Sequence, residues 1–374
     1  MRIGVNARFL LPEKLEGIGW YSYQILKRMV DQHPEHEYFF FYDRKQNNLL
    51  LQHPSIHHIV VSPPARHPLL WYFWFEWSLP AAFKKNKINC VFHPDGYCSL
   101  SANIPQVMVV HDLAYLHFPE QVPLLVRKYY QYFVPRQIKK ANHLIAVSKA
   151  TASDIAEHFP EMASKISIGY NGVRECFKPL DDVQQKEIRQ QFSQGVPYSL
   201  FVGAIHPRKN VTGLIHAFEI FKTNTGSEMK LMIVGRKAWF VQDFEKTINT
   251  SAFKTDIILL DYMQSLELAK ITASAFAVVQ PSFLEGFGVP VLEALNCDIP
   301  VLVADCFSLP EVAGPGAYLF DPYKPPEIAE QMEIALKDSH RAEKIQLGRT
   351  HRTQFDWDKS AEIIYFQIIS NAKA

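Results

Sequence analysis

Cysteine is scarce in this sequence: five thiols are spread over 374 residues, and no two of them form a Cys-x-x-Cys pair. An odd number of widely spaced cysteines does not suit a disulfide framework, and the paired spacing of a zinc site is missing. We therefore expect a protein of a reducing compartment. The five cysteines are Cys90, Cys98, Cys176, Cys297 and Cys306.

Long apolar runs and an excess of one charge are also missing. No apolar stretch is long enough to span a bilayer, and the N-terminus, Met1 to Val5, lacks the apolar core of a signal peptide. The formal net charge is +1, which gives no basis for bulk binding of nucleic acid. We expect a cytoplasmic protein with no nucleic-acid partner.

What the chain does contain is a repeated alternation of apolar runs with helical patterns. This alternation predicts an α/β fold with parallel sheets. The length exceeds that of a usual single core, so we expect two domains, with a boundary near residue 180 in the polar segment 178–194. The expected strands are 2–6, 38–42, 56–61, 107–110, 143–147 and 165–170 in the first domain, and 199–202, 230–234, 256–260, 276–280 and 300–304 in the second.

The segment 281–295 contains a glycine-rich turn. It follows an apolar run at 275–279 that predicts a buried strand. Gly286 and Gly288 allow a tight turn and a close approach of the backbone to a ligand. Pro290 suits the first turn of a helix, and the free amides of that helix start favour an anion placed before them.

Two glutamates accompany this anion site. Glu285 lies in the turn and Glu293 about one turn inside the expected helix. An ionised carboxylate only accepts hydrogen bonds, so it would repel a bare phosphate but bind hydroxyl groups. A ligand that carries both phosphates and many hydroxyls is a nucleotide sugar.

The glutamates have the spacing E-x7-E within Glu-Gly-Phe-Gly-x-Pro-x-Leu-Glu-Ala. In this the chain resembles the retaining glycosyltransferases of family 4 (group 1), and the resemblance extends from Gly17 to the final helix. It implies the GT-B fold, two doubly wound Rossmann-like domains facing across a cleft. These would be an acceptor-side domain at 1–178, with a C-terminal helix at 358–374 packing back on it, and a nucleotide-sugar-binding domain at 179–357.

The resemblance also implies a reaction. A hexose would move from a nucleotide diphosphate sugar to a hydroxyl of a saccharide or lipid-linked saccharide, in the synthesis of a surface polysaccharide or glycolipid. No cofactor is implied, and no metal. The chain has one Asp-x-Asp, Asp356-Trp357-Asp358, but it lies beyond the strands of the second domain, and we interpret Asp358 as a helix cap.

A second motif opens the second domain. Gly203 is followed by Arg208, Lys209 and Asn210, between a predicted strand and a predicted helix. Arg208 offers a planar fork for phosphate oxygens and Lys209 a movable point charge. The sequence matches the family's G-x-x-x-x-R-K-N pattern, which implies that the pair binds the donor diphosphate.

Further positions follow from the resemblance. His111 ends a predicted strand, where ligands collect in open α/β sheets, and its family counterpart touches the donor sugar. Gly17 and Gly19 form a loop that lines the cleft. Arg236 lies in Gly-Arg-Lys-Ala-Trp, ending at Trp239, which resembles a subgroup that includes mannosyltransferases. The expected donor is therefore GDP-mannose or a UDP-sugar.

These observations give two groups of expected site residues. Arg208 and Lys209 would stabilise the leaving diphosphate, Glu285 would hold the sugar, and Glu293 would hold the ribose. The expected catalytic residues are Glu285, His111, Arg208 and Lys209. The expected donor-binding residues are Gly17, Gly19, Gly203, Arg236, Gly286, Phe287, Gly288, Val289 and Glu293.

An aromatic block at 69–77 has two interpretations. Aromatic side chains followed by Lys84, Lys85 and Lys87 suit a peripheral membrane contact through 69–87, on the inner face of the membrane. Neighbouring rings cannot all face one way, so packing in the first domain's core is the other interpretation.

Other functions fit parts of the pattern. A GT-B nucleotide-sugar epimerase or a sugar phosphorylase shares the fold, and a non-catalytic nucleotide-sugar-binding protein shares the site. A nicotinamide dehydrogenase would need a full G-x-G-x-x-G with an acidic residue about 20 positions later, which neither domain shows. One departure from the family is Asp298, where a glycine is usual; Asp298 is expected to adopt a left-handed conformation.

Overall fold

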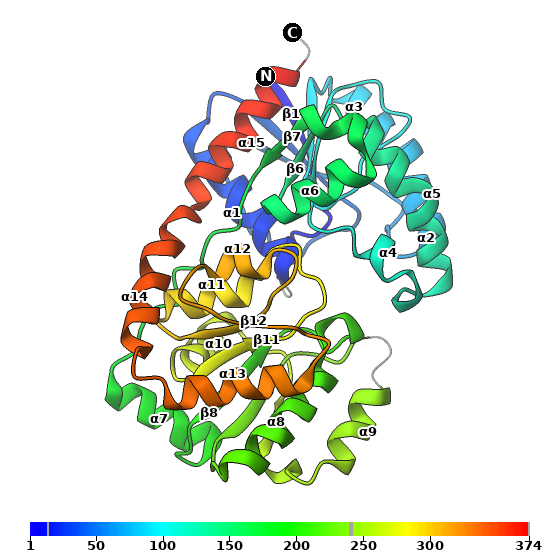
Figure 1. Cartoon of the computed structure of the whole chain (residues 1–374). Helices are drawn as coiled ribbons and strands as arrows, with labels where there is room; N and C mark the ends of the chain where they lie inside the picture. The colour runs from blue at the N-terminus through cyan, green and yellow to red at the C-terminus, as the bar shows by residue number, and fades with distance from the viewer. Residues whose placement is uncertain (13–14, 239–241, 373–374) are drawn as a thin grey trace. The chain divides into compact units, whose positions relative to one another are not determined.

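Two parallel sheets organise the chain, each in its own unit, in the computed structural model (Figure 1). The structure describes residues 1–12, 15–238 and 242–372. Unit 1 comprises Met1–Asn171 and Asp356–Ala374, and unit 2 comprises Gly172–Phe355. The predicted α/β class is confirmed, and the division into functional domains at 178/179 stays a prediction.

Unit 1 contains a seven-stranded sheet in the order β3-β2-β1-β4-β5-β6-β7. Its strands pair in parallel, for example Val5 with Phe40 on one side and Phe92 on the other. The strands are β1 Arg2–Asn6, β2 Glu37–Tyr42, β3 Ile56–Val60, β4 Cys90–His93, β5 Gln106–Val110, β6 His143–Ala146 and β7 Ile166–Ile168. The six predicted strands are confirmed, whereas β4, a four-residue strand at the centre of the sheet, was not predicted.

The helices of unit 1 cover this sheet. Ser148 caps α6 by accepting a hydrogen bond from the Thr151 amide. The helical segments are α1 Gly17–Gln32, α2 Pro68–Phe73, the π-helix η1 Trp74–Ser78, α3 Leu79–Lys85, α4 Ala114–His117, η2 Pro119–Gln121, α5 Leu124–Lys140, α6 Lys149–His158, η3 Pro160–Lys165 and α15 Trp357–Asn371.

The last helix, α15, runs beside α1 within unit 1 (Figure 1). The prediction that Asp358 caps it is wrong, because the cap is Asp356, whose carboxylate accepts from the amides of Asp358 and Lys359. The cap lies two residues earlier than expected, and the helix begins at Trp357. Asp358 therefore lies in its first turn and pairs with Arg28 of α1 at 2.9 Å.

Unit 2 contains a six-stranded sheet in the order β10-β9-β8-β11-β12-β13. The five predicted strands are confirmed, and the short edge strand β13 was not predicted. The strands are β8 Tyr198–Val202, β9 Lys230–Val234, β10 Ile257–Leu260, β11 Ala277–Gln280, β12 Val301–Ala304 and β13 Tyr318–Phe320.

The helices of unit 2 lie on the faces of this sheet, with α8 beside α13 (Figure 1). Asp298 follows α11 with a φ of 60°, so the predicted left-handed conformation is confirmed. The helical segments are α7 Asp182–Ser193, η4 Pro207–Lys209, α8 Val211–Thr225, α9 Gln242–Thr250, η5 Lys254–Asp256, α10 Ser265–Ala273, α11 Val289–Asn296, α12 Leu309–Ala313, α13 Pro325–Lys337, α14 Arg341–His351 and η6 Arg352–Gln354.

The aromatic block of unit 1 divides between core and surface. Trp74 and Phe75 are buried in a cluster with Phe41, Leu79 and neighbouring apolar residues. Leu69, Tyr72, Phe73 and Trp77 are exposed. Core packing therefore accounts for part of the block, and the membrane contact stays a prediction. Within the described residues, none of the helices has the length and apolar character needed to cross a bilayer.

Two valines of the unit 1 sheet allow a matched test of core packing. Val109 in β5 is fully buried, whereas Val60 in the edge strand β3 is 52% exposed. We expect Val109→Ala to lower the free energy of unfolding by about 2 kcal/mol, since two buried methyl groups are lost and a cavity remains. Val60→Ala should change it little. Urea unfolding followed by circular dichroism measures both, and equal effects would contradict this core assignment.

Candidate active site

The carboxyl ends of the unit 2 strands carry most of the predicted site residues. Gly203 follows β8, Arg236 lies just beyond β9, and the segment 281–288 links β11 to α11. Gly203 and Gly235 pack against each other, because a Cβ on Gly235 would lie 2.0 Å from the Gly203 carbonyl oxygen. Glycine at this point lets the two loops that begin there approach closely.

Three of the expected catalytic residues meet at this edge. Lys209 Nζ lies 2.5 Å from Glu285 Oε1, and Arg208 Nη1 lies 3.9 Å from Glu285 Oε2. Arg208 also donates to the Leu284 carbonyl at 2.6 Å, and its own carbonyl accepts from the Phe283 amide at 2.9 Å. These bonds hold the turn after β8 against the turn after β11. The strands β8 and β11 are neighbours in the sheet.

The Glu285 carboxylate is buried and surrounded by donors. Its Oε1 also accepts from Ser282 Oγ at 2.7 Å and from Gln280 Nε2 at 2.9 Å. Burial raises the pKa of Glu285, but the positive charges of Lys209 and Arg208 outweigh that effect, so the pKa lies below its usual value. Glu285 is therefore ionised at neutral pH and available to accept hydrogen bonds.

The loop after Glu285 is fixed by its own neighbours. Ser308, which is buried, donates to the carbonyl oxygens of Glu285 and Phe287. Gly288 has a φ of 98°, and a Cβ there would lie 2.9 Å from Leu309. Gly286 and Phe287 are buried, and Val289 begins α11 with Pro290 in its first turn, as predicted. The loop therefore holds the start of α11 in one place.

Glu293 has a different environment, which the sequence did not indicate. Its Oε1 accepts from Arg174 Nε at 2.8 Å, and Arg174 Nη1 donates to Ser265 at 2.7 Å. Burial raises the pKa of Glu293, and Arg174 opposes the rise only in part. The Arg174 guanidinium lies over the ring of Phe177, with its central carbon 4.6 Å from the ring centroid. In the sequence this residue is only an arginine that follows Asn171-Gly172-Val173.

The remaining expected residues belong to unit 1. His111 follows β5, and its Nε2 donates to the Pro94 carbonyl at 2.7 Å. Burial lowers the pKa of His111, so the ring is neutral and Nδ1 is its acceptor nitrogen. Asp112 accepts from the Ala114 amide and thus holds the loop that starts α4.

Gly17 and Gly19, the two glycines of the first loop, differ in the space around them. A Cβ on Gly19 would lie 2.9 Å from the Phe9 carbonyl oxygen, so the loop there packs closely. Gly17, the first residue of α1, has open space around its Cα. A Cβ at Gly17 would therefore have no heavy atom of the described residues within 4 Å.

A buried ion pair near His111 also escaped the sequence analysis. Arg8 Nη2 lies 3.0 Å from Asp95 Oδ2, and Asn6 Nδ2 donates to Asp95 Oδ1 at 2.8 Å. Asp95 follows Pro94, whose carbonyl binds His111. The pair was missed because Asp95 follows β4, the strand that was not predicted.

The structure thus brings Arg208, Lys209 and Glu285 together, and it places Gly203, Arg236 and the segment 286–289 at the same edge of the unit 2 sheet. Glu293 lies one turn inside α11. Gly17, Gly19 and His111 belong to unit 1. The subgroup pattern at Arg236 ends with Trp239, which lies outside the described residues.

Comparison with known protein families agrees with this arrangement. Residues 15–175 match the profile described as Glycosyltransferase Family 4, and residues 183–350 match the profile described as Glycosyl transferases group 1. Solved glycosyltransferase structures share the fold. WaaG, from lipopolysaccharide biosynthesis, superposes with a TM-score of 0.76 at 16% identity, over 97% of this chain and 99% of its own.

The fold and the two matched domains define a glycosyltransferase of the GT-B class. More particularly, the chain consists of a family 4 domain followed by a group 1 domain.

Curated relatives span most of the chain. O-antigen chain mannosyltransferase B of Escherichia coli is 25% identical over 360 residues, covering 92% of this chain and 93% of the relative. O-antigen chain mannosyltransferase RfbU of Salmonella typhimurium is 26% identical over 301 residues, covering 79% and 78%. Anabaena HepE, solved in complex with UDP-glucose, has a TM-score of 0.74 at 17% identity, over 99% of this chain and 100% of its own.

The ion pair of Lys209 with Glu285 predicts a particular pH dependence. In the wild type the lowered pKa of Glu285 adds stability above the unfolded pKa of about 4.3, and that stability is lost as the pH falls. In Lys209→Met the carboxylate stays buried without its nearest cation. Its pKa then rises, and stability is lost as the pH increases above about 4.3. We expect a deficit of about 3 kcal/mol at pH 7 that shrinks toward pH 4.

Lys237→Met is the matched control. Lys237 pairs with Glu245 at 2.6 Å in the same unit, but both side chains are about half exposed. Its loss should change stability little at either pH. Urea unfolding at pH 4 and pH 7 measures both variants. A Lys209→Met deficit that is independent of pH would contradict the assigned charge state of Glu285.

Proposed function

We propose that the protein is a retaining hexosyltransferase. It transfers mannose from a nucleotide diphosphate donor, GDP-mannose, to a hydroxyl of a saccharide or lipid-linked saccharide during synthesis of a surface polysaccharide or glycolipid. The observation that carries the proposal is the cluster of Lys209, Arg208 and the ionised Glu285 beside the start of α11. The O-antigen mannosyltransferases among the relatives support mannose as the sugar.

The chemical step requires charge stabilisation on the leaving group. The bond between the anomeric carbon and the diphosphate oxygen breaks, and its electron pair stays on the diphosphate. Arg208, Lys209 and the first amides of α11 stabilise that charge. The acceptor oxygen attacks the same face of the sugar, and its proton passes to a donor phosphate oxygen. No protein nucleophile takes part in this mechanism.

The carboxylates serve to bind the donor. When the diphosphate engages Lys209, Glu285 is left to accept hydrogen bonds from sugar hydroxyls, together with the backbone around Phe287 and Gly288. Glu293 holds the ribose, and Arg174 orients that carboxylate. Arg236 lies near the nucleobase. From unit 1, His111 contacts the transferred sugar, and Gly17 and Gly19 line the donor and acceptor region.

A donor assay tests this proposal directly. We expect transfer from GDP-mannose to a lipid-linked saccharide acceptor, with a rate that falls about 10²–10³-fold in Glu285→Gln, by analogy with the loss of a transition-state hydrogen bond. Glu285→Gln preserves the side-chain shape but removes the charge. Product formation followed by mass spectrometry measures the rate in both proteins.

Glu245→Gln is the control, since Glu245 is an exposed partner of Lys237 in the same unit. It should transfer at the wild-type rate. Full activity of Glu285→Gln would contradict the assigned role. The same assay with UDP-glucose, which is bound in the HepE structure, tests whether the enzyme prefers the base and the sugar of GDP-mannose. A changed sugar configuration without acceptor would instead favour an epimerase.

We also propose that unit 1 contacts the membrane through residues 69–87. The exposed members of the aromatic block lie on α2 and η1, with Phe73 50% and Trp77 66% exposed. Tyr72 touches Phe133 of α5, a helix that also carries the exposed apolar side chains Leu124, Leu125 and Tyr132. The exposed lysines Lys84, Lys85 and Lys87 follow α2 and η1 in the chain. Exposed rings with lysines close to them in the chain suit an anionic lipid surface.

Vesicle binding tests this contact. We expect sedimentation with phosphatidylglycerol vesicles, weakened about tenfold in the double variant Phe73→Ser, Trp77→Ser, because two apolar side chains no longer enter the interface. Phe366→Ser is the control, since Phe366 on α15 of the same unit is similarly exposed. Unchanged binding of the double variant, or an equal loss in the control, would contradict the proposed contact.

A further inference from the structure

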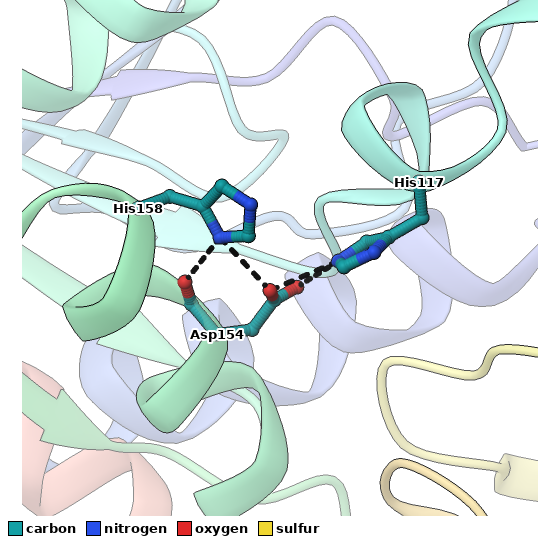
Figure 2. Close-up of side chains that lie close together, drawn as sticks. All are labelled: His117, Asp154 and His158. Carbon is teal, nitrogen blue, oxygen red and sulfur yellow. Dashed lines mark hydrogen bonds and ion pairs between the residues drawn. The ribbon is translucent and has the colours of Figure 1, made fainter.

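Three potential metal ligands converge in unit 1, and none of the three is a residue that the proposed transfer uses. His117 ends α4, and Asp154 and His158 lie one helical turn apart on α6 (Figure 2). Both imidazole rings direct a nitrogen at the Asp154 carboxylate (Figure 2). The ligand atoms of the three side chains lie within 4.8 Å of one another.

The distances are close to those of a coordination shell. His117 Nε2 lies 2.9 Å from Asp154 Oδ1, and His158 Nδ1 lies 3.2 Å from the same oxygen. Zinc bonds to nitrogen and oxygen of about 2.0–2.2 Å place neighbouring tetrahedral ligands roughly 3.3–3.5 Å apart. Small rotations of the side chains would therefore admit an ion among the three atoms.

We propose that His117, Asp154 and His158 form a binding site for a divalent transition-metal ion, with Zn²⁺ as its probe. Each neutral imidazole binds through a lone pair, so the proton now on His117 Nε2 or His158 Nδ1 moves to the other ring nitrogen. The ion then replaces the hydrogen bonds that these nitrogens make with the carboxylate. It also replaces the bond from His158 Nδ1 to the Asp154 carbonyl.

The ligand set selects the class of ion. Two imidazoles and one carboxylate suit Zn²⁺, Co²⁺ or Ni²⁺, whereas Mg²⁺ and Ca²⁺ prefer oxygen ligands. Asp154 is 9% exposed in its side chain, and His117 and His158 are 27% and 33% exposed. A buried anion between two partly exposed imidazoles leaves an outer position for water, as in three-ligand zinc sites.

The ion would connect two elements that are separate in the chain. His117 comes from α4, which begins three residues after His111, and the other two ligands come from α6. Coordination would fasten α4 to α6 and restrain the loop 111–117. The site needs no sugar donor, so its presence or absence does not depend on the proposed transfer.

Zinc titration of the full chain tests the site. In competition with a chromophoric chelator, we expect one equivalent of Zn²⁺ to bind, with a Kd that rises tenfold or more in His158→Gln and in His117→Gln. His216→Gln is the matched control, because His216 also faces a carboxylate, Glu219 at 3.4 Å, but forms no three-ligand group among the described residues. It should bind Zn²⁺ as the wild type does.

Further measurements test whether the variants are folded and whether the ion binds at these three residues. His158 is partly exposed at the end of α6, so its variant should keep the wild-type circular dichroism. Zn²⁺ should raise the melting temperature of the wild type and not that of His158→Gln. Co²⁺ should show bands of nitrogen and oxygen ligation. The proposal would be overturned if the wild type bound no Zn²⁺, or if its affinity for Zn²⁺ equalled that of both ligand variants. A thiolate-to-cobalt charge-transfer band would also overturn it.

Discussion

The contact between Lys209 and the buried Glu285 carboxylate is the interaction on which the candidate site depends. A carboxylate in the interior of a protein is costly unless cations and donors surround it. Lys209, Arg208, Ser282 and Gln280 meet that requirement. Because Lys209 follows β8 and Glu285 follows the adjacent strand β11, satisfying one charge fixes the relative position of two loops.

The second glutamate shows how environment separates two chemically identical groups. Glu285 has its pKa lowered by two nearby cations, whereas burial keeps the pKa of Glu293 above its usual value despite Arg174. Arg174 comes from the segment between β7 and α7, far from Glu293 in the chain. The same residue type, eight positions apart, thus carries a different balance of charge and burial.

Unit 1 repeats this arrangement with other residues. His111 follows β5, and Pro94 and Asp95 follow the neighbouring strand β4. Burial keeps the imidazole neutral, and the Arg8–Asp95 pair fixes the loop that accepts its hydrogen bond. In both units, polar side chains at the carboxyl ends of adjacent strands hold one another in place.

The sequence alone determined the α/β class, the strands with long apolar runs, and the loops that carry Arg208, Lys209, Glu285 and His111, because these depend on local pattern and spacing. It also determined the left-handed Asp298, since few residue types tolerate that conformation. Only the tertiary structure decided the pairing of Arg174 with Glu293 and the burial of Trp74 beside the exposed Trp77. Those outcomes depend on which surfaces meet when distant segments pack, and no periodicity within one segment records that.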